Sequence, residues 1–312
     1  MTALDTVAAY LPDRRVPIEE LAGRLELTGS QVQVLRRIRG LSEVCRTRPG
    51  ELPIDLLTAA VDRLDGLRGR EHLVRHVLYA RGVPLTTPFP VNPLHDLCRH
   101  AGLSHANAFT VTHHACATSL LAVDLAGRLL LADGDQEALA LVVAGETVFA
   151  HDPRLPPDAR VLGEAAGACL VSADGPRDRV LAYACHQRGD LDHWLSVDAG
   201  DFADRFAREY RTLLAEVINA AVGRAGLRLD EIALILPHNV NVASWHGVCR
   251  VLGFPPERVM LHNVPRVGHT FAADAFVNYR TATELDLLRP GDRYLVAAAG
   301  YGATFSAMVF EH

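Results

Sequence analysis

The chain contains no lysine, because all 31 of its basic residues are arginine. Schiff-base chemistry, lysine-bound pyridoxal phosphate and the Walker-A phosphate loop each need a lysine side chain, so those mechanisms are excluded. The chain has 312 residues, of which 49% are hydrophobic and 22% charged. That length and composition allow a large core, formed either by one domain or by two closely packed halves.

The sequence also lacks signals for a membrane or for export. No segment has the ~20 consecutive uncharged apolar residues that cross a bilayer. Residues 1–15 show no basic start followed by a long apolar run. We therefore expect a soluble, cytoplasmic protein. The net charge of −6 argues against nucleic acid as a partner. The densest arginine group (Arg36, Arg37 and Arg39) is either a solvated helix face or a contact for a phosphate or an acidic protein.

Paired cysteines are absent too. The six cysteines lie at positions 45, 98, 116, 169, 185 and 249, and no two form a C-x-x-C pair. This excludes a zinc knuckle and a thioredoxin-like motif. His72 and His76 are four residues apart, as metal ligands on a helix can be, but no third ligand is evident and the segment is strand-like. We expect no metal and no bound cofactor.

Apolar runs of strand length alternate with longer segments of helical periodicity. Strands are predicted at 72–80, 108–111, 138–144, 168–171, 180–184, 232–236, 294–298 and 305–310, and helices at 54–64, 93–101, 117–132, 201–225, 244–252 and 272–288. This alternation predicts an α/β fold. The central strands are almost continuously apolar, as expected when helices cover both faces of a sheet.

The chain shows signs of an internal duplication. Each half offers a strand, a long helix, another strand and a Gly-rich turn into a last strand. Residues 163–171 (GEAAGACLV) correspond to residues 300–310 (GYGATFSAMVF), and residues 172–179 are a plausible seam. We predict two similar halves, 1–172 and 173–312. The GYG turn from Gly300 to Gly302 precedes a strand and not a helix, so it is not a dinucleotide-binding loop.

One cysteine differs from the other five in its setting. In AFTVTHHACATSLLAVDLAGRLLLADG, a β-prone run ends at two histidines, Cys116 follows, and a helix of apolar periodicity begins. The positive end of a helix dipole favours thiolate over thiol. The free N–H groups of the first turn can bind an oxyanion. The alternative is a buried structural cysteine in a small-residue turn. The strand–Cys–helix setting favours a nucleophile.

Two of the fifteen histidines stand at comparable positions. His238 follows the buried strand of ALILPHNVNVASW, where Pro237 stops the strand. His269 follows Gly268 in VPRVGHTFAADAF, before a helix that begins with small residues. Ligands and catalytic groups gather at such strand ends in α/β sheets, and a thiol nucleophile needs a distant base. Each histidine alone would be a surface or capping residue, but together with Cys116 they predict a reaction centre.

At this point the sequence resembles a known family, the ketosynthase III branch of the thiolase superfamily, across nearly the whole chain. The resemblance rests on YLPDRRVPIEEL, HHACATSLLA, VVAGETVF, GEAAGACLVS, LPHNVNVASWHGVCRVLGF, VGHTFAADA and GYGATFSAMVF, in that order. It implies a five-layered α-β-α-β-α thiolase fold, a homodimer, and acyl-CoA or acyl carrier protein thioesters as substrates. It also implies Cys116 as the acyl-accepting nucleophile, His238 as the catalytic histidine, and Asn241, Gly300 and Gly302 as oxyanion or pocket residues.

The sequence departs from the family's pattern at several positions. His269, in G-H-T-F, stands where the family has an asparagine, and its role is an oxyanion donor, a base or a near-isosteric replacement. The tryptophan expected at the CoA channel is missing, and Ala243 replaces a CoA-contacting arginine. GEAAGA replaces G-D-G-A-G-A, and the N-terminal strand is short. These changes suggest acyl carrier protein in place of CoA, or a task in a specialised pathway such as polyketide biosynthesis.

Three functional hypotheses follow. The leading one is a ketosynthase-III-like acyltransferase that loads an acyl group on Cys116 and condenses it decarboxylatively with a malonyl-type thioester, with His238 and His269 stabilising the enolate. The second keeps the acyl-enzyme but passes the acyl group to an alcohol or amine. The third is a non-catalytic partner subunit, although such subunits usually lack the nucleophile. Pocket depth is expected to depend on residues near 84–89 and 202–206.

Overall fold

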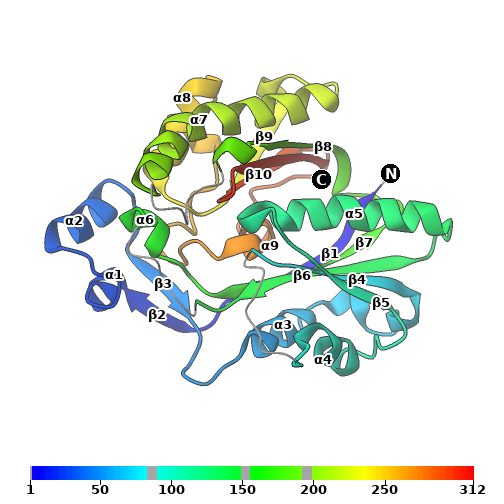
Figure 1. Ribbon diagram of the computed structural model, residues 1–312. Helices are drawn as coiled ribbons and strands as arrows, with labels where there is room; N and C mark the ends of the chain where they lie inside the picture. The colour runs from blue at the N-terminus through cyan, green and yellow to red at the C-terminus, as the bar shows by residue number, and fades with distance from the viewer. Residues whose placement is uncertain (1, 83–89, 149–154, 192–198) are drawn as a thin grey trace.

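The computed structural model describes residues 2–82, 90–148, 155–191 and 199–312, with side chains from residue 205 onward in the last range. Within them, nine strands form one continuous sheet in the order β5-β4-β6-β7-β1-β8-β11-β10-β9. These strands are β1 (Ala3–Tyr10), β4 (Val74–Ala80), β5 (Asn107–Val111), β6 (Leu139–Glu146), β7 (Ala165–Ser172), β8 (Arg179–Gln187), β9 (Ile232–Pro237), β10 (Arg293–Gly300) and β11 (Thr304–Glu311). Figure 1 shows that the sheet folds into two layers with helices between them.

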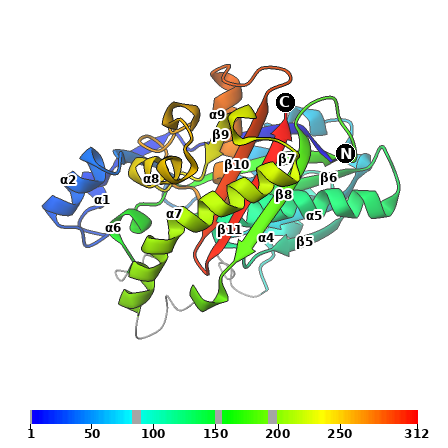
Figure 2. The ribbon, with the colours of Figure 1, turned by 90° about the horizontal axis from the view of Figure 1, so that it is seen from above.

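Three layers of helices enclose and separate the two sheet layers, giving the succession α-β-α-β-α seen in Figure 1. The outer layers are α3 (Pro53–Val61) with α4 (Pro93–His100), and α7 (Ala199–Arg224) with α8 (Val242–Leu252). The middle layer is α5 (Thr118–Asp133) with α9 (Asp274–Glu284). Figure 2 shows α7 crossing the outer face of the sheet formed by β8, β10 and β11. The predicted thiolase-type fold class is confirmed.

The alternation of side chains along each strand creates the separate cores between these layers. In β6, Leu139, Leu141 and Val143 face the core of α3 and α4, whereas Ala140 and Val142 face the middle layer. A period of two sends successive side chains to opposite faces of a sheet, so a strand covered on both faces is apolar throughout. This is the physical reason for the continuous apolar runs of the sequence.

The two sheet layers repeat one topology. The order β1-β7-β6-β4 on one side of the β1–β8 junction corresponds to β8-β11-β10-β9 on the other. An isolated parallel bridge from Ile235 to Val259 lies beside β9, where β5 lies beside β4 in the first layer. β7 ends at Ser172 and β8 begins at Arg179. The division of the chain into halves at residue 172 stays a prediction.

The middle helix α5, which follows Cys116, is strongly apolar. By length and composition, the segment Ala115–Asp133 is apolar enough to cross a bilayer, but half of it is buried inside the fold. It also carries an exposed ion pair between Arg128 and Asp124. Its position between two sheet layers is that of a core helix.

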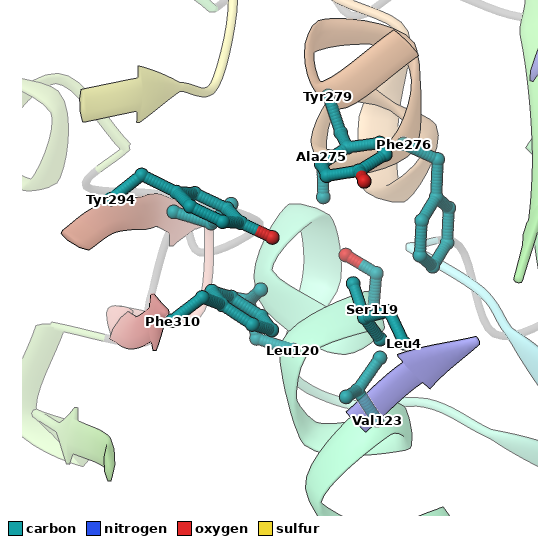
Figure 3. Close-up of a pocket in the computed structure, with 10 residues that line it drawn as sticks. Leu4, Ser119, Leu120, Val123, Ala275, Phe276, Tyr279, Tyr294 and Phe310 are labelled. Atoms are coloured by element: carbon teal, nitrogen blue, oxygen red, sulfur yellow. The ribbon is translucent and has the colours of Figure 1, made fainter. Parts of the chain in front are cut away.

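A small internal cavity of about 20 Å³ lies where the two middle helices meet the sheet, between Ser119, Val123, Phe276 and Tyr294 (Figure 3). That volume holds about one water molecule and no acyl chain. It is therefore a gap in the packing of the middle layer and not a substrate pocket.

A smaller unit precedes the main fold. β2 (Arg14–Pro17) pairs with β3 (Glu43–Arg46), and α1 (Ile18–Leu21), α2 (Gly29–Arg37) and α6 (Pro157–Arg160) lie beside them. Thr28 caps α2 through a capping box with Gln31. In the arginine group of this unit, Arg36 pairs with Glu19 at 2.6 Å and Arg39 with Asp158 at 3.7 Å. Two of the three arginines thus have acidic partners within the chain.

Every strand and helix predicted from the sequence is present, with ends that differ by a few residues. The largest difference is at the last helix, predicted at 272–288, which begins at Asp274 and ends at Glu284. The prediction missed β1, β2, β3 and the short helices α1, α2 and α6. The N-terminal strand, which the sequence indicated only as short and without a range, is β1; it has eight residues and pairs with β7 from Ala3 to Tyr10, with an irregularity between Leu4 and Thr6.

Candidate active site

The sequence positions Cys116 on a tight turn at the start of the middle helix. β5 ends at Val111, a 3₁₀ turn spans Ala115–Ala117, and α5 begins at Thr118. Cys116 itself is partly exposed, whereas Cys45, Cys98, Cys169 and Cys249 are buried. The predicted strand–turn–helix setting is therefore present, with the helix N-terminus next to the thiol.

The end of β10 packs directly against this turn. A side chain at Gly300 would place its Cβ 2.3 Å from the His114 carbonyl oxygen and 3.1 Å from the Cys116 nitrogen. Only glycine allows the two backbones to approach so closely. Gly302, with φ of +94°, turns the chain from β10 into β11. The glycines of the GYG segment therefore shape the surroundings of Cys116, and their part in binding an oxyanion stays a prediction.

His269 lies in contact with the thiol, although the two residues are 153 positions apart. Its Nε2 is 3.0 Å from Cys116 Sγ. The His269 carbonyl oxygen accepts a hydrogen bond of 2.8 Å from the Gly163 nitrogen. A Cβ at Gly163 would lie 2.2 Å from the Val267 carbonyl oxygen. The GEAAGA segment thus holds the loop of His269 by close backbone contact.

The second nitrogen of His269 is bound to a buried carboxylate. His269 Nδ1 lies 2.5 Å from Asp274 Oδ2, and Asp274 is 2% exposed. Asp274 also accepts hydrogen bonds from the backbone nitrogens of Asn239 at 2.6 Å and of Thr270 at 2.8 Å. Cys116, His269 and Asp274 therefore form a line of three polar groups.

The neighbouring groups Cys116, His269 and Asp274 stabilise one another's charged forms. Burial alone would lower the pKa of His269, but the Cys116 sulfur and the Asp274 carboxylate outweigh it and raise that pKa well above its ordinary value. Burial would raise the pKa of Asp274, but His269 and the donors of Asn239 and Thr270 hold it below its ordinary value. Both shifts favour the imidazolium form of His269 and the carboxylate form of Asp274.

His238 lies beside His269 but has different neighbours. The two imidazole rings are 5.9 Å apart between centroids and nearly perpendicular. His238 Nε2 is 3.0 Å from the Tyr210 hydroxyl. The Trp245 indole N–H donates to the His238 carbonyl oxygen at 2.9 Å. Burial, with the charge of His269 as a second cause, lowers the pKa of His238 to about 3. His238 is therefore neutral at neutral pH.

An aromatic wall surrounds the hydroxyl that contacts His238. Phe206 stacks on Tyr301 at 5.1 Å and on Phe305 at 5.9 Å, and it is 5.8 Å from Tyr210. Burial raises the pKa of Tyr210 well above its ordinary value, so its hydroxyl stays protonated. These aromatic side chains give His238 apolar surroundings, whereas the neighbouring His269 contacts a carboxylate.

The loops around Cys116 hold the backbone in an unusual conformation. Positive φ angles occur at His113 (+72°), Ala115 (+46°), Phe271 (+57°) and Ala303 (+53°). L-residues with a side chain avoid this region, and each costs on the order of 1–3 kcal/mol. These are four of the seven non-glycine residues with positive φ in the described ranges. Such strain persists where surrounding structure enforces it, as at active sites.

Two predicted residues have other contacts. Asn241 caps α8, with Oδ1 accepting from the Ser244 nitrogen at 2.7 Å and Nδ2 donating to Asp158 at 2.8 Å. These are contacts of a helix cap, and its role in the pocket stays a prediction. His76, considered above as a metal ligand, has Nε2 2.7 Å from Asp133 Oδ2. The segment 84–89, expected to shape the acyl pocket, lies outside the described residues.

Sequence reasoning missed two residues of the site. Asp274 had a signal, since it is the only acidic residue in VGHTFAADAF and follows His269 by five positions. Tyr210 had none, because it lies 28 residues before His238 and on α7, whereas His238 follows β9. Only the packing of α7 on the sheet brings its hydroxyl to the imidazole.

Comparisons with known proteins agree with this fold. Residues 222–312 match the family model described as 3-Oxoacyl-[acyl-carrier-protein (ACP)] synthase III C terminal. A beta-ketoacyl-acyl-carrier-protein synthase III from Rhizorhabdus wittichii is 29% identical over 226 residues, which cover 68% of this chain and 69% of that protein. The synthase III of Rhodobacter capsulatus is 28% identical over 98% of this chain and 97% of its own length.

The crystal structure of 3-oxoacyl-acyl-carrier-protein synthase III from Aquifex aeolicus matches all of both chains with a TM-score of 0.85 and 21% identity. At that identity the structural match establishes the fold. The fold and the sequence relatives together support an acyl-transferring enzyme of the thiolase superfamily. Within that superfamily the chain is ketosynthase-III-like, and the resemblance seen in the sequence is confirmed.

Proposed function

We propose that this chain loads an acyl group on Cys116 and condenses it decarboxylatively with a malonyl-type thioester, in a specialised pathway such as polyketide biosynthesis. The observation that carries the proposal is the 3.0 Å contact between Cys116 Sγ and His269 Nε2 at the N-terminus of a buried helix. A thiol in contact with an imidazole at the N-terminus of a helix is equipped to attack a thioester carbonyl.

In the first half-reaction, the Cys116 sulfur attacks the thioester carbonyl carbon, and the carbonyl oxygen becomes an oxyanion. Backbone N–H groups near Cys116 and Gly302 hold that oxyanion. The bond from the carbonyl carbon to the carrier sulfur then breaks. His269, as the imidazolium 3.0 Å from Cys116, protonates the departing carrier thiolate. This half-reaction leaves an acyl-enzyme and a neutral His269.

In the second half-reaction, the bond between the carboxylate carbon and the methylene carbon of a malonyl-type thioester breaks. Carbon dioxide leaves, and the electron pair of that bond forms the enolate. The Nδ1–H of the neutral His269 stays on Asp274, so its Nε2 must first take a proton from solvent before it can donate. Neutral His238 and the reprotonated His269 then donate hydrogen bonds to the enolate oxygen. The enolate carbon attacks the acyl carbonyl of the acyl-enzyme and the bond to Cys116 breaks, which gives a 3-oxoacyl thioester. The Cys116 thiolate is regenerated beside the His269 imidazolium. The Tyr210 hydroxyl holds a hydrogen-bonding position on His238 that a substrate oxygen can share or take over.

A second candidate function is favoured by one observation, the contact of His269 with Asp274. A histidine bound to a carboxylate is a strong base once the acyl-enzyme has formed, and it can deprotonate an alcohol or amine. The acyl group would then leave Cys116 as an ester or an amide, with no decarboxylation. Release of carbon dioxide from a malonyl donor separates the two functions.

The proposal includes the partners. Either acyl-CoA or acyl carrier protein donates the acyl group, and the missing CoA-contacting groups favour the carrier protein. We also propose that the protein is cytoplasmic and that it forms a homodimer. β5, which leads into the turn of Cys116, lies at one edge of the sheet, and an open strand edge is a ready site for pairing with a second chain. Sedimentation equilibrium measures the dimer directly.

The test is intact-protein mass spectrometry after incubation with a panel of acyl-CoAs and acyl carrier protein thioesters. We expect an acyl adduct on the wild type that disappears in Cys116→Ala. Cys185→Ala is the matched control, because Cys185 is the other partly exposed cysteine, and its adduct should persist. Absence of an adduct from every donor would favour the non-catalytic partner subunit. An adduct that persists in Cys116→Ala would overturn the assignment of the nucleophile.

A further inference from the structure

The two nitrogens of His269 are both engaged, one by the nucleophile and one by a carboxylate. Cys116 Sγ lies 3.0 Å from Nε2, and Asp274 Oδ2 lies 2.5 Å from Nδ1. A hydrogen bond at Nδ1 fixes the orientation of an imidazole ring and the nitrogen that carries its proton. In this site it directs Nε2 at the sulfur.

The carboxylate is itself held in place by four further hydrogen bonds. Oδ1 accepts from the Thr270 nitrogen at 2.8 Å, the Thr270 hydroxyl at 2.7 Å and Asn239 Nδ2 at 3.1 Å. Oδ2 accepts from the Asn239 nitrogen at 2.6 Å. Asn239 is held in turn, since its Oδ1 accepts from Asn278 at 2.9 Å. A carboxylate with this many donors is stabilised in its ionised form and cannot rotate away.

We propose that Asp274 is a positioning residue that holds His269 as an imidazolium directed at Cys116, so that the resting nucleophile is a thiolate. This inference rests on the proposed function, because it takes Cys116 to be the nucleophile. Formation of the pair moves one proton from Sγ to Nε2 and leaves a negative sulfur beside a positive ring. The negative charge of Asp274 compensates the buried positive ring, which would otherwise be costly.

Several titratable groups of the described residues surround this pair. The buried Glu146 side chain accepts a hydrogen bond from the Gly82 nitrogen beside the Cys116 turn, and burial lowers the pKa of His114. His238, on the loop after β9, is neutral because its pKa is about 3. Burial keeps the phenols of Tyr210 and Tyr301 protonated by raising their pKa values. Asp158, beyond these tyrosines, pairs with Arg39 and Asn241. The pair of Cys116 and His269 is thus compensated by Asp274 and by the N-terminus of α5.

This arrangement explains why a histidine stands where the resemblance led us to expect an asparagine. An asparagine can donate a hydrogen bond but cannot carry a proton between the nucleophile and a leaving group. With Asp274 behind it, His269 can hold the proton of Cys116 at rest and deliver it to the leaving thiol. The acid, the histidine and the small residues between them form one unit within VGHTFAADA.

The main test measures the pH dependence of Cys116 alkylation by iodoacetamide, read at the peptide that contains Cys116. In Asp274→Asn we expect the midpoint of the profile to rise by about one pH unit and the rate at pH 7 to fall about tenfold. Asp133→Asn is the matched control, because it removes another His–Asp contact, the one at His76. Asp133 is the last residue of α5, seventeen positions after Cys116, and its variant should react like the wild type. An unchanged profile in folded Asp274→Asn would overturn the proposal.

A double-mutant cycle separates positioning from general damage. If Asp274 acts through His269, then Asp274→Asn added to His269→Gln should change the alkylation profile little further. Equal and additive effects in the two backgrounds would contradict the proposal. The readout uses no acyl donor. A normal alkylation profile in Asp274→Asn together with a retained acyl adduct would overturn the role of Asp274 and leave the proposed function standing. A shifted profile in a protein that forms no acyl adduct would support the role of Asp274 and overturn the proposed function.

The asparagine of Asp274→Asn turns an amide NH₂ toward donors of Asn239 or Thr270, so this variant can fail to fold. Two measurements then use proteins that keep Asp274. The wild type should show thiolate absorbance near 240 nm at pH 7 that His269→Gln and Cys116→Ala lose. Its proton spectrum should contain a downfield resonance from His269 Nδ1 that His269→Gln removes. A wild type with neither signal refutes the resting ion pair.

Discussion

The two histidines next to Cys116 have opposite surroundings, although their rings are only 5.9 Å apart. His269 lies between a sulfur and a carboxylate, and its pKa is raised. His238 lies between a phenol and an indole, and its pKa is lowered to about 3. Both rings are buried, at 9% and 3% exposure. Burial therefore does not distinguish them, and the charge of the nearest neighbour does.

The difference indicates a division of labour. A histidine that holds a proton at neutral pH can protonate a leaving thiol, whereas a neutral histidine in a dry setting can donate a hydrogen bond without bringing a charge. We expect His269 to govern the formation of the acyl-enzyme and His238 to govern the use of the malonyl donor. The predictions below test that separation, from the largest expected effect to the smallest.

His269→Gln should slow acylation of Cys116 by about 10²–10⁴-fold, because the variant loses the group that accepts and returns the proton. Single-turnover mass spectrometry of the acyl adduct measures this rate. His262→Gln is the control, since His262 is exposed and its Nε2 lies 3.4 Å from the Arg266 guanidinium group. Acylation at the wild-type rate in His269→Gln would remove the distinction between the two histidines.

His238→Gln should slow carbon dioxide release from the malonyl donor by about 10²–10³-fold, the usual cost of losing one donor to a developing oxyanion. Acylation of Cys116 should stay within about threefold of the wild type, because His269 and Asp274 are retained. The measurement combines adduct mass with carbon dioxide release under the same conditions. Equal losses in both half-reactions would show that the histidines act as one unit.

Acidification should reveal the neutral histidine through stability. Between pH 6.5 and about 3, the unfolded chain protonates His238 while the folded chain does not. The unfolded state then binds more protons, so stability falls as the pH falls through this window. From pH 6.5 to 5 the loss is about 2 kcal/mol in unfolding free energy. His269 contributes in the opposite sense, because the stability from its raised pKa is fully present below pH 6.5.

Urea unfolding of the wild type and of His238→Gln at pH 7 and pH 5 measures that loss. We expect the variant to lose about 2 kcal/mol less than the wild type on acidification. His246→Gln serves as the control, because His246 is exposed on α8. A His238→Gln variant as acid-sensitive as the wild type would contradict a neutral, buried His238.

Tyr210→Phe should have the smallest effect. It removes the hydroxyl 3.0 Å from His238 Nε2, at a cost of about 1 kcal/mol in unfolding free energy, and slows carbon dioxide release by a few-fold only. Tyr294→Phe is the matched control, because it loses a buried hydroxyl that contacts Asp178 at 3.0 Å in the middle layer (Figure 3). The control should lose stability without losing turnover. If Tyr210→Phe also slowed the acylation of Cys116, the surroundings of His238 and His269 would not act separately.

Much of the fold was predictable because its strands are buried on both faces. The runs at 138–144 and 232–236 are apolar throughout, so their type and limits could be read from composition alone. β1 escaped prediction because Asp5 and Thr6 interrupt its apolar pattern, and its pairing with β7 became visible only in the folded chain. β2 and β3 have four residues each, too few for a periodic signal.

The sequence alone determined the class of the fold, the turn that carries Cys116 and the position of His238 at the end of a strand, because local periodicity, Pro237 and the small residues around Cys116 act within a few positions of the chain. It also named His269 as a candidate, which the structure places in a loop. Only the tertiary structure decided which histidine touches the thiol and which one is neutral. Those outcomes depend on Asp274 and Tyr210, which approach the rings through loop closure and the packing of α7. The charge state of a buried imidazole is set by the atoms within about 4–6 Å of it, and no pattern along the chain specifies which atoms those are.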